Sequence, residues 1–180
     1  MDAAPTAATL MVQGCTSWAG KSLLTTVLCR WLADPGVDVA PFKAQNMANN
    51  ARVVEDGEIG VAQWLQARAP RGPATVDHNP ILLKPEADTR SQVVVHGRGR
   101  GDLTALPWRS RASHLRPAIE SSLRRLRAAH EVVVIEGPAR RPRSTCRTWS
   151  TARWRGGPES DRSRGRSTPV PAIGPITDRS

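Results

Sequence analysis

The chain of 180 residues has no tyrosine, one phenylalanine and three cysteines. Cys15, Cys29 and Cys146 are widely spaced and fit no metal-binding pattern, which favours reduced thiols over a disulfide framework. No apolar run approaches the roughly 20 residues of a membrane span, and the N-terminus lacks the basic and apolar segments of a signal peptide. These absences predict a cytoplasmic protein of one domain with an appendage.

Lysine is also scarce, with 3 lysines against 23 arginines, yet the formal net charge is +10. A charge of this size first suggests a nucleic acid or another anionic partner. The charge is unevenly placed, however, because residues 1–137 carry a net charge of only +3. Residues 138–180 hold ten arginines and three acidic residues, a net charge of +7.

That C-terminal segment differs from the rest in more than charge. It lacks apolar periodicity and is rich in Pro, Gly, Ser, Thr and Arg. Such a composition buries too little apolar surface to offset the entropy lost on ordering. We therefore predict an ordered domain over residues 1–137 and a disordered tail over residues 138–180.

The N-terminal part of the domain predicts a βαβ unit. An apolar run at residues 9–13 indicates a buried strand, residues 22–33 have helical spacing, and the next strand starts at residue 37. This order favours an α/β fold with a parallel sheet. The remaining expected elements are helices at 58–69 and 113–129, short β-like runs at 80–85 and 91–96, and a buried strand at 131–135; the Asn-rich residues 42–54 are left unassigned.

The segment between the first strand and the first helix resembles a phosphate-binding loop. Gly20, Lys21 and Ser22 supply a small residue, a cation for phosphates and a hydroxyl for Mg²⁺ at a helix start. Gly14 lies one place before the first glycine of the usual spacing. The alternative is a glycine-containing turn with an incidental lysine, but the strand before it and the helix after it favour the phosphate loop.

Three further charged residues are candidates for the same site. Glu136 ends the strand EVVVI, where a carboxylate can hold Mg²⁺ opposite the loop hydroxyl, although many strands end in Glu. Lys43 follows the second strand and either contacts an anionic group or is solvated. Glu58 opens the next expected helix, where a carboxylate also has a capping role.

Longer segments carry a family resemblance. Residues 12–22, VQGCTSWAGKS, resemble the VQGTTSDAGKS of cobyric acid synthases, and residues 40–53, APFKAQNMANNARV, resemble their PFKAQNMSNN segment. Residues 58–63, EIGVAQ, resemble their EIGRAQ helix, and residues 79–98 resemble their NPVLLKP and SQVVV segments. VVVIEG at 132–137 is similar to the start of their VVVEGAGSPAEINL. The resemblance spans residues 9–137.

The resemblance implies a P-loop NTPase-like, dethiobiotin synthetase-like sheet with flanking helices. It implies ATP- and Mg²⁺-dependent amidation of side-chain carboxylates on a corrinoid, adenosylcobyrinic acid a,c-diamide, with ammonia from glutamine, in cobalamin biosynthesis. Lys21 and Lys43 would be catalytic. Carried over by motif, the phosphate-binding residues would be Thr16, Gly20, Lys21 and Ser22, the Mg²⁺ environment Ser22, Glu58 and Glu136, and the residues facing phosphate or the corrinoid carboxylate Lys43, Gln45 and Asn46.

The sequence departs from the family pattern in two places. Trp18 stands where the family loop has Asp, and the match ends at Gly137 without AGSPAEINL or a glutaminase domain. Residues 137–146, GPARRPRSTC, can be back-translated so that another frame reads AGSPAEINL. We therefore expect a one-base shift at Gly137 and an incomplete domain, whose missing strands would leave apolar edges unpaired.

Two other functions are alternatives to this one. A stand-alone ATP-dependent carboxylate-activating enzyme of the dethiobiotin synthetase type would need a complete fold, which the missing strands oppose. A nucleic-acid-binding protein would use the Arg-rich tail, with Trp149 and Trp154 stacking on bases. A solvated tail without that role is the favoured interpretation, and no membrane partner is expected.

Overall fold

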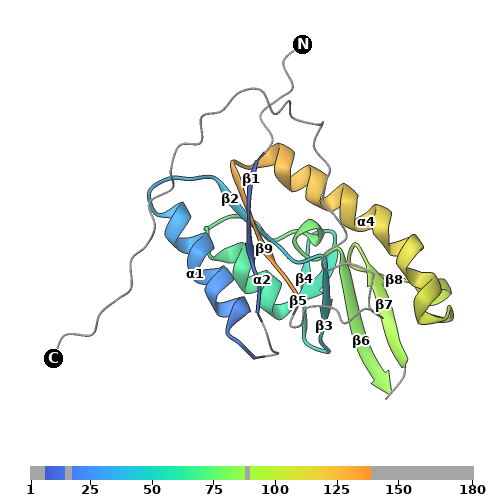
Figure 1. Cartoon of the computed structure of the whole chain (residues 1–180). Coiled ribbons are helices and arrows are strands. Elements are labelled where there is room, and N and C mark those ends of the chain that lie inside the picture. The colour runs from blue at the N-terminus through green and yellow to red at the C-terminus, as the bar shows by residue number, and fades with distance from the viewer. Residues whose placement is uncertain (1–6, 15–17, 88–89, 139–180) are drawn as a thin grey trace, which may run out of the picture.

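The structure, a computed structural model, describes residues 7–14, 18–87 and 90–138. Helices are interspersed among groups of strands along this part of the chain (Figure 1). The expected tail, apart from Pro138, lies outside these residues. The elements are β1 (Ala8–Val12), α1 (Lys21–Ala33), β2 (Val39–Phe42), β3 (Gln45–Met47), β4 (Ala51–Val54), β5 (Gly57–Gly60), α2 (Val61–Arg68), the 3-10 helix η1 (Val76–His78), β6 (Ile81–Ala87), β7 (Arg90–Val95), β8 (Arg98–Gly99), α3 (Gly101–Thr104), α4 (Trp108–Ala129) and β9 (Val132–Glu136).

A three-stranded sheet of order β1-β9-β2 forms the centre of the domain. Both neighbours of β9 are parallel to it, with Val12 paired to Glu136 and Phe42 paired to Ile135. The apolar run of β9 suits this central place, because a parallel strand is covered on both faces. The predicted α/β fold with a parallel sheet and flanking helices is confirmed.

Helices cover the two faces of this sheet. Val133 is fully buried in a cluster with Phe42 and the α4 residues Ile119 and Leu123, whereas Val134 is buried with Cys29 of α1. Because successive side chains of a strand point to opposite faces, α4 and α1 lie on opposite sides of β9. The amphipathic helix expected at 113–129 is confirmed, and it begins earlier, at Trp108.

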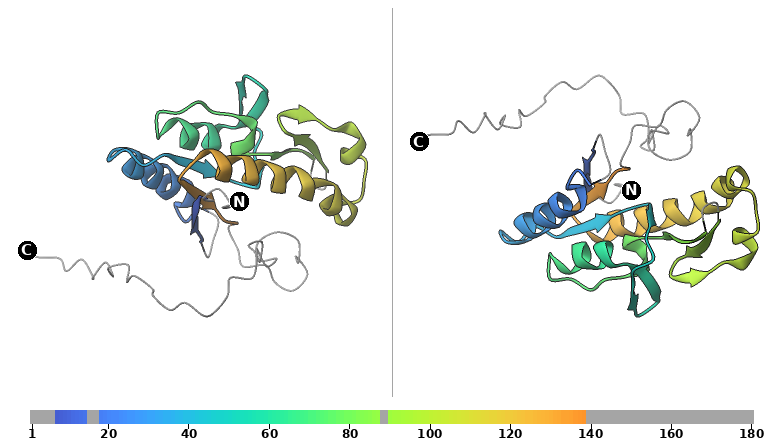
Figure 2. Two further views of the ribbon diagram at one scale, coloured as in Figure 1. Left: turned by 90° about the horizontal axis from the view of Figure 1, so that it is seen from above. Right: turned by 90° about the horizontal axis from the view of Figure 1, so that it is seen from below.

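The second half of the domain adds a four-stranded sheet of order β3-β6-β7-β8 and the hairpin β4-β5. Strand β3 is parallel to β6, and β6 and β7 form an antiparallel pair with Ile81 opposite Val95. Helix α4 extends from the central sheet to the β6-β7 pair (Figures 1 and 2). Its inner residue Leu115 therefore shares one core with Ile81 and Leu83.

The expected helix at 58–69 is wrong in its first turn. Glu58 lies in β5, opposite Val53 of β4, and α2 begins only at Val61. Pairing with β4 holds these residues extended, so Glu58 is not a helix cap. The Asn-rich stretch left unassigned contains β3 and β4, whose short runs carry little apolar periodicity.

The outer side of α1 and the edge of β1 expose apolar side chains. Among the described residues, β1 pairs only with β9. The exposed fractions are 45% for Leu10 and 43% for Met11 on β1, and 70% for Leu23, 50% for Leu24, 52% for Val27 and 67% for Trp31 on α1. We call the four residues of α1 the outer apolar face. Within the described ranges, no helix is long and apolar enough to cross a membrane.

Candidate functional site

The carboxyl ends of β1, β2 and β9 meet at one edge of the central sheet. The Gly137 N–H donates to the Val12 carbonyl at 2.9 Å, which closes the end of β9 onto the end of β1. A Cβ on Gly137 would lie 2.8 Å from Gln13 side-chain atoms, so a larger residue here would displace the end of the Gln13 side chain. Ligands of open parallel sheets bind at this edge.

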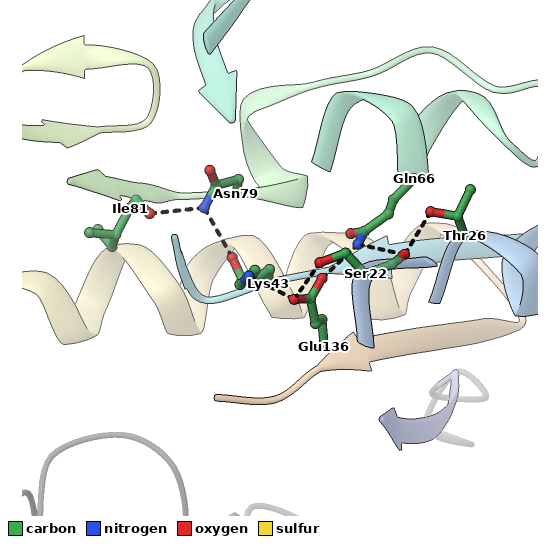
Figure 3. Close-up of polar contacts among 7 residues, drawn as sticks. All are labelled: Ser22, Thr26, Lys43, Gln66, Asn79, Ile81 and Glu136. Carbon is green, nitrogen blue, oxygen red and sulfur yellow. Dashed lines mark hydrogen bonds and ion pairs between the residues drawn. The ribbon is translucent and has the colours of Figure 1, made fainter. Parts of the chain in front are cut away.

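Glu136 is the centre of a polar cluster at that edge (Figure 3). Its Oε1 accepts hydrogen bonds from Ser22 Oγ at 2.9 Å and Lys43 Nζ at 2.7 Å. Its Oε2 accepts one from Gln66 Nε2 at 2.6 Å. The Glu136 side chain is only 1% exposed. Burying a carboxylate is costly, and these donors offset that cost.

Helix α1 brings the loop residues to this cluster. The backbone of Gly20 is left-handed, with φ of 73°, and α1 begins directly after it at Lys21. The Ser22 carbonyl accepts hydrogen bonds from Thr26 Oγ1 at 2.7 Å and Gln66 Nε2 at 3.3 Å. The Ser22 hydroxyl therefore lies at the first turn of a helix, where backbone N–H groups and the helix dipole favour an anion.

Lys21 is buried beside the start of the loop. A Cβ on Gly14 would lie 2.8 Å from Lys21 Cδ and 3.1 Å from its Nζ, so the lysine lies directly over Gly14. Trp18, which replaces the family aspartate, is fully exposed and has a positive φ of 64°. Thr16 lies outside the described residues, so its predicted contact with phosphate has no structural counterpart here.

Backbone contacts fix the position of Lys43. Its N–H donates to the His78 carbonyl at 2.9 Å, and its carbonyl accepts from Asn79 Nδ2 at 3.2 Å. Asn79 Nδ2 also donates to the Ile81 carbonyl at 2.8 Å, and Asn79 Oδ1 accepts from the Gly60 N–H at 3.2 Å. Buried Asn79 thus links the end of β2 to β6 and to the start of α2.

The predicted site residues on β3 and β5 have different surroundings. Gln45 and Asn46 lie on β3, shortly after Lys43, and both are partly buried. Glu58 is held by Lys84, whose Nζ lies 2.6 Å from both of its carboxylate oxygens. The structure therefore brings Ser22 and Glu136 together and pairs Glu58 with Lys84. The Mg²⁺ environment of Ser22, Glu58 and Glu136 stays a prediction.

The arrangement of oxygen atoms suits Mg²⁺ in part. Ser22 Oγ and Glu136 Oε1 are adjacent, and Mg²⁺ accepts one or two protein oxygens together with water and phosphate. Across the described part of the chain, no three His, Cys, Asp or Glu side chains form a metal-binding group. A fully protein-made metal cage is therefore absent there, and Ser22 with Glu136 is the pair that fits a phosphate-bound Mg²⁺.

Sequence reasoning missed Gln66 and Asn79. The apolar residues at helical spacing in 58–69 are Ile59, Ala62, Leu65 and Ala69. Leu65 is nevertheless 51% exposed, and the buried residues of α2 are Gln63, Gln66 and Ala67. The sequence signal that could have revealed Gln66 was its spacing from Gln63, because residues three apart share a helix face. For Asn79, the only sequence signal was its position before the apolar run of β6.

Comparison with known proteins is consistent with a ligand site at this edge of the parallel sheet. The sequence matches the CobQ/CobB/MinD/ParA nucleotide binding domain over residues 10–162. It is 60% identical over 136 residues to the cobyric acid synthase of Albidiferax ferrireducens, covering 73% of this chain and 28% of that protein. It is 59% identical over 128 residues to that of Variovorax paradoxus, covering 71% and 27%. No solved structure matches the chain.

The chain thus spans about 28% of the length of the first of these relatives. The matched region contains Ser22, Lys43 and Glu136, which the structure gathers at one edge of a parallel sheet. The chain belongs to the CobQ/CobB/MinD/ParA nucleotide binding domain family.

Proposed function

We propose that this chain provides the ATP-dependent carboxylate-activating part of a cobyric acid synthase, which amidates corrinoid carboxylates in cobalamin biosynthesis. The observation that carries the proposal is the contact of Ser22 and Lys43 with one buried carboxylate, Glu136. These residues come from three segments that end or begin at the ligand-binding edge of the sheet. The reaction class that we propose comes from the name of the relatives, cobyric acid synthase.

In this function, the loop and α1 would bind the ATP phosphates. Lys21 would neutralise phosphate charge, and the N–H groups of the first turn of α1 would donate to phosphate oxygens. Ser22 and Glu136 would hold Mg²⁺, which screens the charge of the terminal phosphate when it is bound. Thr16 and Gly20 would complete the loop.

Lys43 would act on the second reactant. Its Nζ lies 2.7 Å from Glu136, so a cation is already placed beside the expected phosphate position. A substrate carboxylate oxygen would attack the terminal phosphorus and displace ADP, which gives an acyl phosphate. Lys43, with Gln45 and Asn46, would hold the two anionic reactants together against their mutual repulsion.

The amide nitrogen is proposed to come from glutamine through a glutaminase domain beyond the match to residues 9–137. The reaction would take place in the cytoplasm, where ATP is available. The alternative of nucleic-acid binding depends on tail residues outside the described ranges, and no contact in the described domain favours it.

The test is equilibrium binding of ATP with Mg²⁺ to the purified full chain, measured by calorimetry. Lys21→Ala should weaken binding by about 100-fold, because loss of a charged phosphate contact costs about 2–3 kcal/mol. Arg116→Ala is the matched control, since it also removes one positive charge but on the exposed side of α4. Equal affinities for wild type and Lys21→Ala would contradict the proposed function.

A further inference from the structure

The carboxyl end of β2, which carries Lys43 directly after it, has one edge that faces away from β9. Among the described residues β2 pairs only with β9, so backbone groups on that outer edge need partners from elsewhere. These groups are the Pro41 carbonyl, the Lys43 N–H and the Lys43 carbonyl. Proline has no N–H, which suits an edge strand and leaves no donor to satisfy at Pro41. One donor and two acceptors around Lys43 therefore require partners.

Two consecutive residues of the segment after α2, His78 and Asn79, supply all three partners. The His78 carbonyl accepts from the Lys43 N–H at 2.9 Å, and the His78 ring nitrogen Nδ1 lies 2.9 Å from the Pro41 carbonyl oxygen. Asn79 Nδ2 donates to the Lys43 carbonyl at 3.2 Å (Figure 3). The end of η1 thus takes the place of a neighbouring strand on this edge. It fixes the backbone on both sides of the Lys43 side chain.

The buried ring of His78 lies between two carbonyl oxygens. Its Nδ1 is 2.9 Å from the Pro41 oxygen and its Nε2 is 3.4 Å from the Pro73 oxygen. Burial lowers the pKa of the His78 imidazole below its ordinary value, so the ring is neutral and has a single N–H. The shorter of the two distances assigns this N–H to Nδ1. The ring therefore donates its one hydrogen bond to β2, at Pro41.

A cavity of about 220 Å³ lies beside this ring, and its wall includes Pro41, Pro73, Thr75 and His78. A cavity of this size with polar groups in its wall has room for water. If the side chain at residue 78 were shortened, water would take over the Pro41 carbonyl. A water molecule exchanges and shifts, whereas a buried ring is held by its packing. The His78 ring therefore gives the Pro41 carbonyl a fixed partner that water would not provide.

We propose that His78 is a positioning residue that sets the direction in which the Lys43 side chain leaves β2 towards Glu136. The Lys43 Nζ lies 2.7 Å from Glu136 Oε1, but a flexible four-carbon stem does not by itself hold an ammonium group in one place. Fixing the backbone at Pro41 and at Lys43 removes part of that freedom, which favours the one geometry that meets the carboxylate. The importance of this geometry for the reaction rests on the proposed function, whereas the link from His78 to Lys43 does not.

The test is competitive labelling of amines in the folded full chain with a small amount of acetic anhydride, read out by mass spectrometry. The chain has only three lysines, so the labelling rate of Lys43 can be compared with that of Lys84, whose Nζ is held by Glu58. Lys43 reacts when its Nζ leaves Glu136. The ratio of the Lys43 rate to the Lys84 rate therefore reports how firmly Lys43 is held.

Two amide substitutions separate the roles of the two ring nitrogens. His78→Asn places an N–H group where Nδ1 lies and should keep the wild-type ratio. His78→Gln places it where Nε2 lies and should raise the ratio about fivefold, the factor that corresponds to loss of one hydrogen bond of about 1 kcal/mol. His78→Leu has no donor and should raise the ratio by the same factor. His130→Leu is the matched control and should keep the ratio, because His130 contacts Asp38 directly before β2 and lines the same cavity.

Three results would overturn the proposal. The first is an unchanged ratio in His78→Leu or His78→Gln, whichever of the two folds, and the second is a rise in His78→Asn equal to that in His78→Gln. A purely structural role predicts the third, a lower Tm with Lys43 and Lys84 labelled faster in the same proportion. The labelling uses no nucleotide, so a failed ATP-binding test would not alter its result, and the two proposals can fail separately.

Discussion

The two sides of α1 differ in a way that is the reverse of most helices in α/β domains. The inner side buries Lys21, Thr25 and Cys29, of which two are polar. The outer side exposes Leu23 and Trp31, with the β1 edge beside it. A helix on a parallel sheet usually turns its apolar side inward and its polar side to water.

The inner side of α1 faces the candidate site, and the outer side is an exposed apolar surface. Polar residues are buried on the inner side because the helix starts at the phosphate loop and faces Glu136, where Ser22 is bonded. Apolar residues gather on the outer side, and an exposed apolar group of this kind marks a surface for contact with other protein. Among the described residues β1 pairs only with β9, so its other edge has no partner strand there.

The largest expected effect comes from placing the same charge on each side of α1. Cys29→Asp would bury an unpaired carboxylate at a position with 0% exposure and should lower the free energy of unfolding by about 3–5 kcal/mol. Leu23→Asp, at 70% exposure, should change it by less than about 0.5 kcal/mol. Urea denaturation measures both, and similar losses would show that the outer side is buried in solution.

The second effect concerns the polar cluster. Glu136→Ala removes the acceptor shared by Ser22, Lys43 and Gln66, so Mg²⁺-dependent ATP binding should weaken by about 100-fold. Glu120→Ala, on the solvent side of α4, is the control for loss of a carboxylate. Calorimetric titration with and without Mg²⁺ is the measurement, and an unaltered Mg²⁺ dependence would exclude Glu136 as a metal ligand.

The third prediction uses the pH dependence of stability to test whether the inner side of α1 is buried. Burial raises the pKa of the Cys29 thiol to about 12 from its ordinary value of 9.0. Above pH 9 the unfolded thiol loses its proton while the folded one keeps it, so unfolding is favoured and stability falls as pH rises towards 12. At pH 10 the loss should be about 1.4 kcal/mol, one pKa unit.

The measurement for this third effect is the difference between wild type and Cys29→Ala in urea denaturation at pH 8 and pH 10. Taking the difference cancels the titration of the three lysines, and the chain has no tyrosine to titrate in this range. A difference that does not change between the two pH values would mean that Cys29 is accessible to water.

The smallest effect concerns the outer apolar face. The triple variant Leu23→Ser, Val27→Ser, Trp31→Ser should lower self-association several-fold and change stability by only about 0.5 kcal/mol per site. Sedimentation velocity over a range of concentrations is the measurement. Val53→Ser, at an 84% exposed position on β4, is the control and should leave association unchanged.

Local patterns predicted much of the fold. The first strand, the helix α1, the amphipathic helix α4 and the buried strand β9 form as expected, because each has a strong periodicity or an uninterrupted apolar run. The expectation that the first strand is buried is wrong, because four of the five residues of β1 are exposed. The prediction failed at Glu58, where pairing with β4 outweighs helix propensity. It also failed for the orientation of α2, where Leu65 is exposed and two glutamines are buried.

The candidate site likewise has a part that the sequence predicted and a part that it did not. The sequence by itself determined the residues at the end of β1, β2 and β9, because a parallel sheet brings such residues to one edge. Only the tertiary structure decided that Glu136 rather than Glu58 meets Ser22, 114 residues away, and that Gln66 completes the cluster. The physical reason is that buried polar groups take partners from whichever segments the fold brings within hydrogen-bond distance, and sequence spacing does not encode that distance.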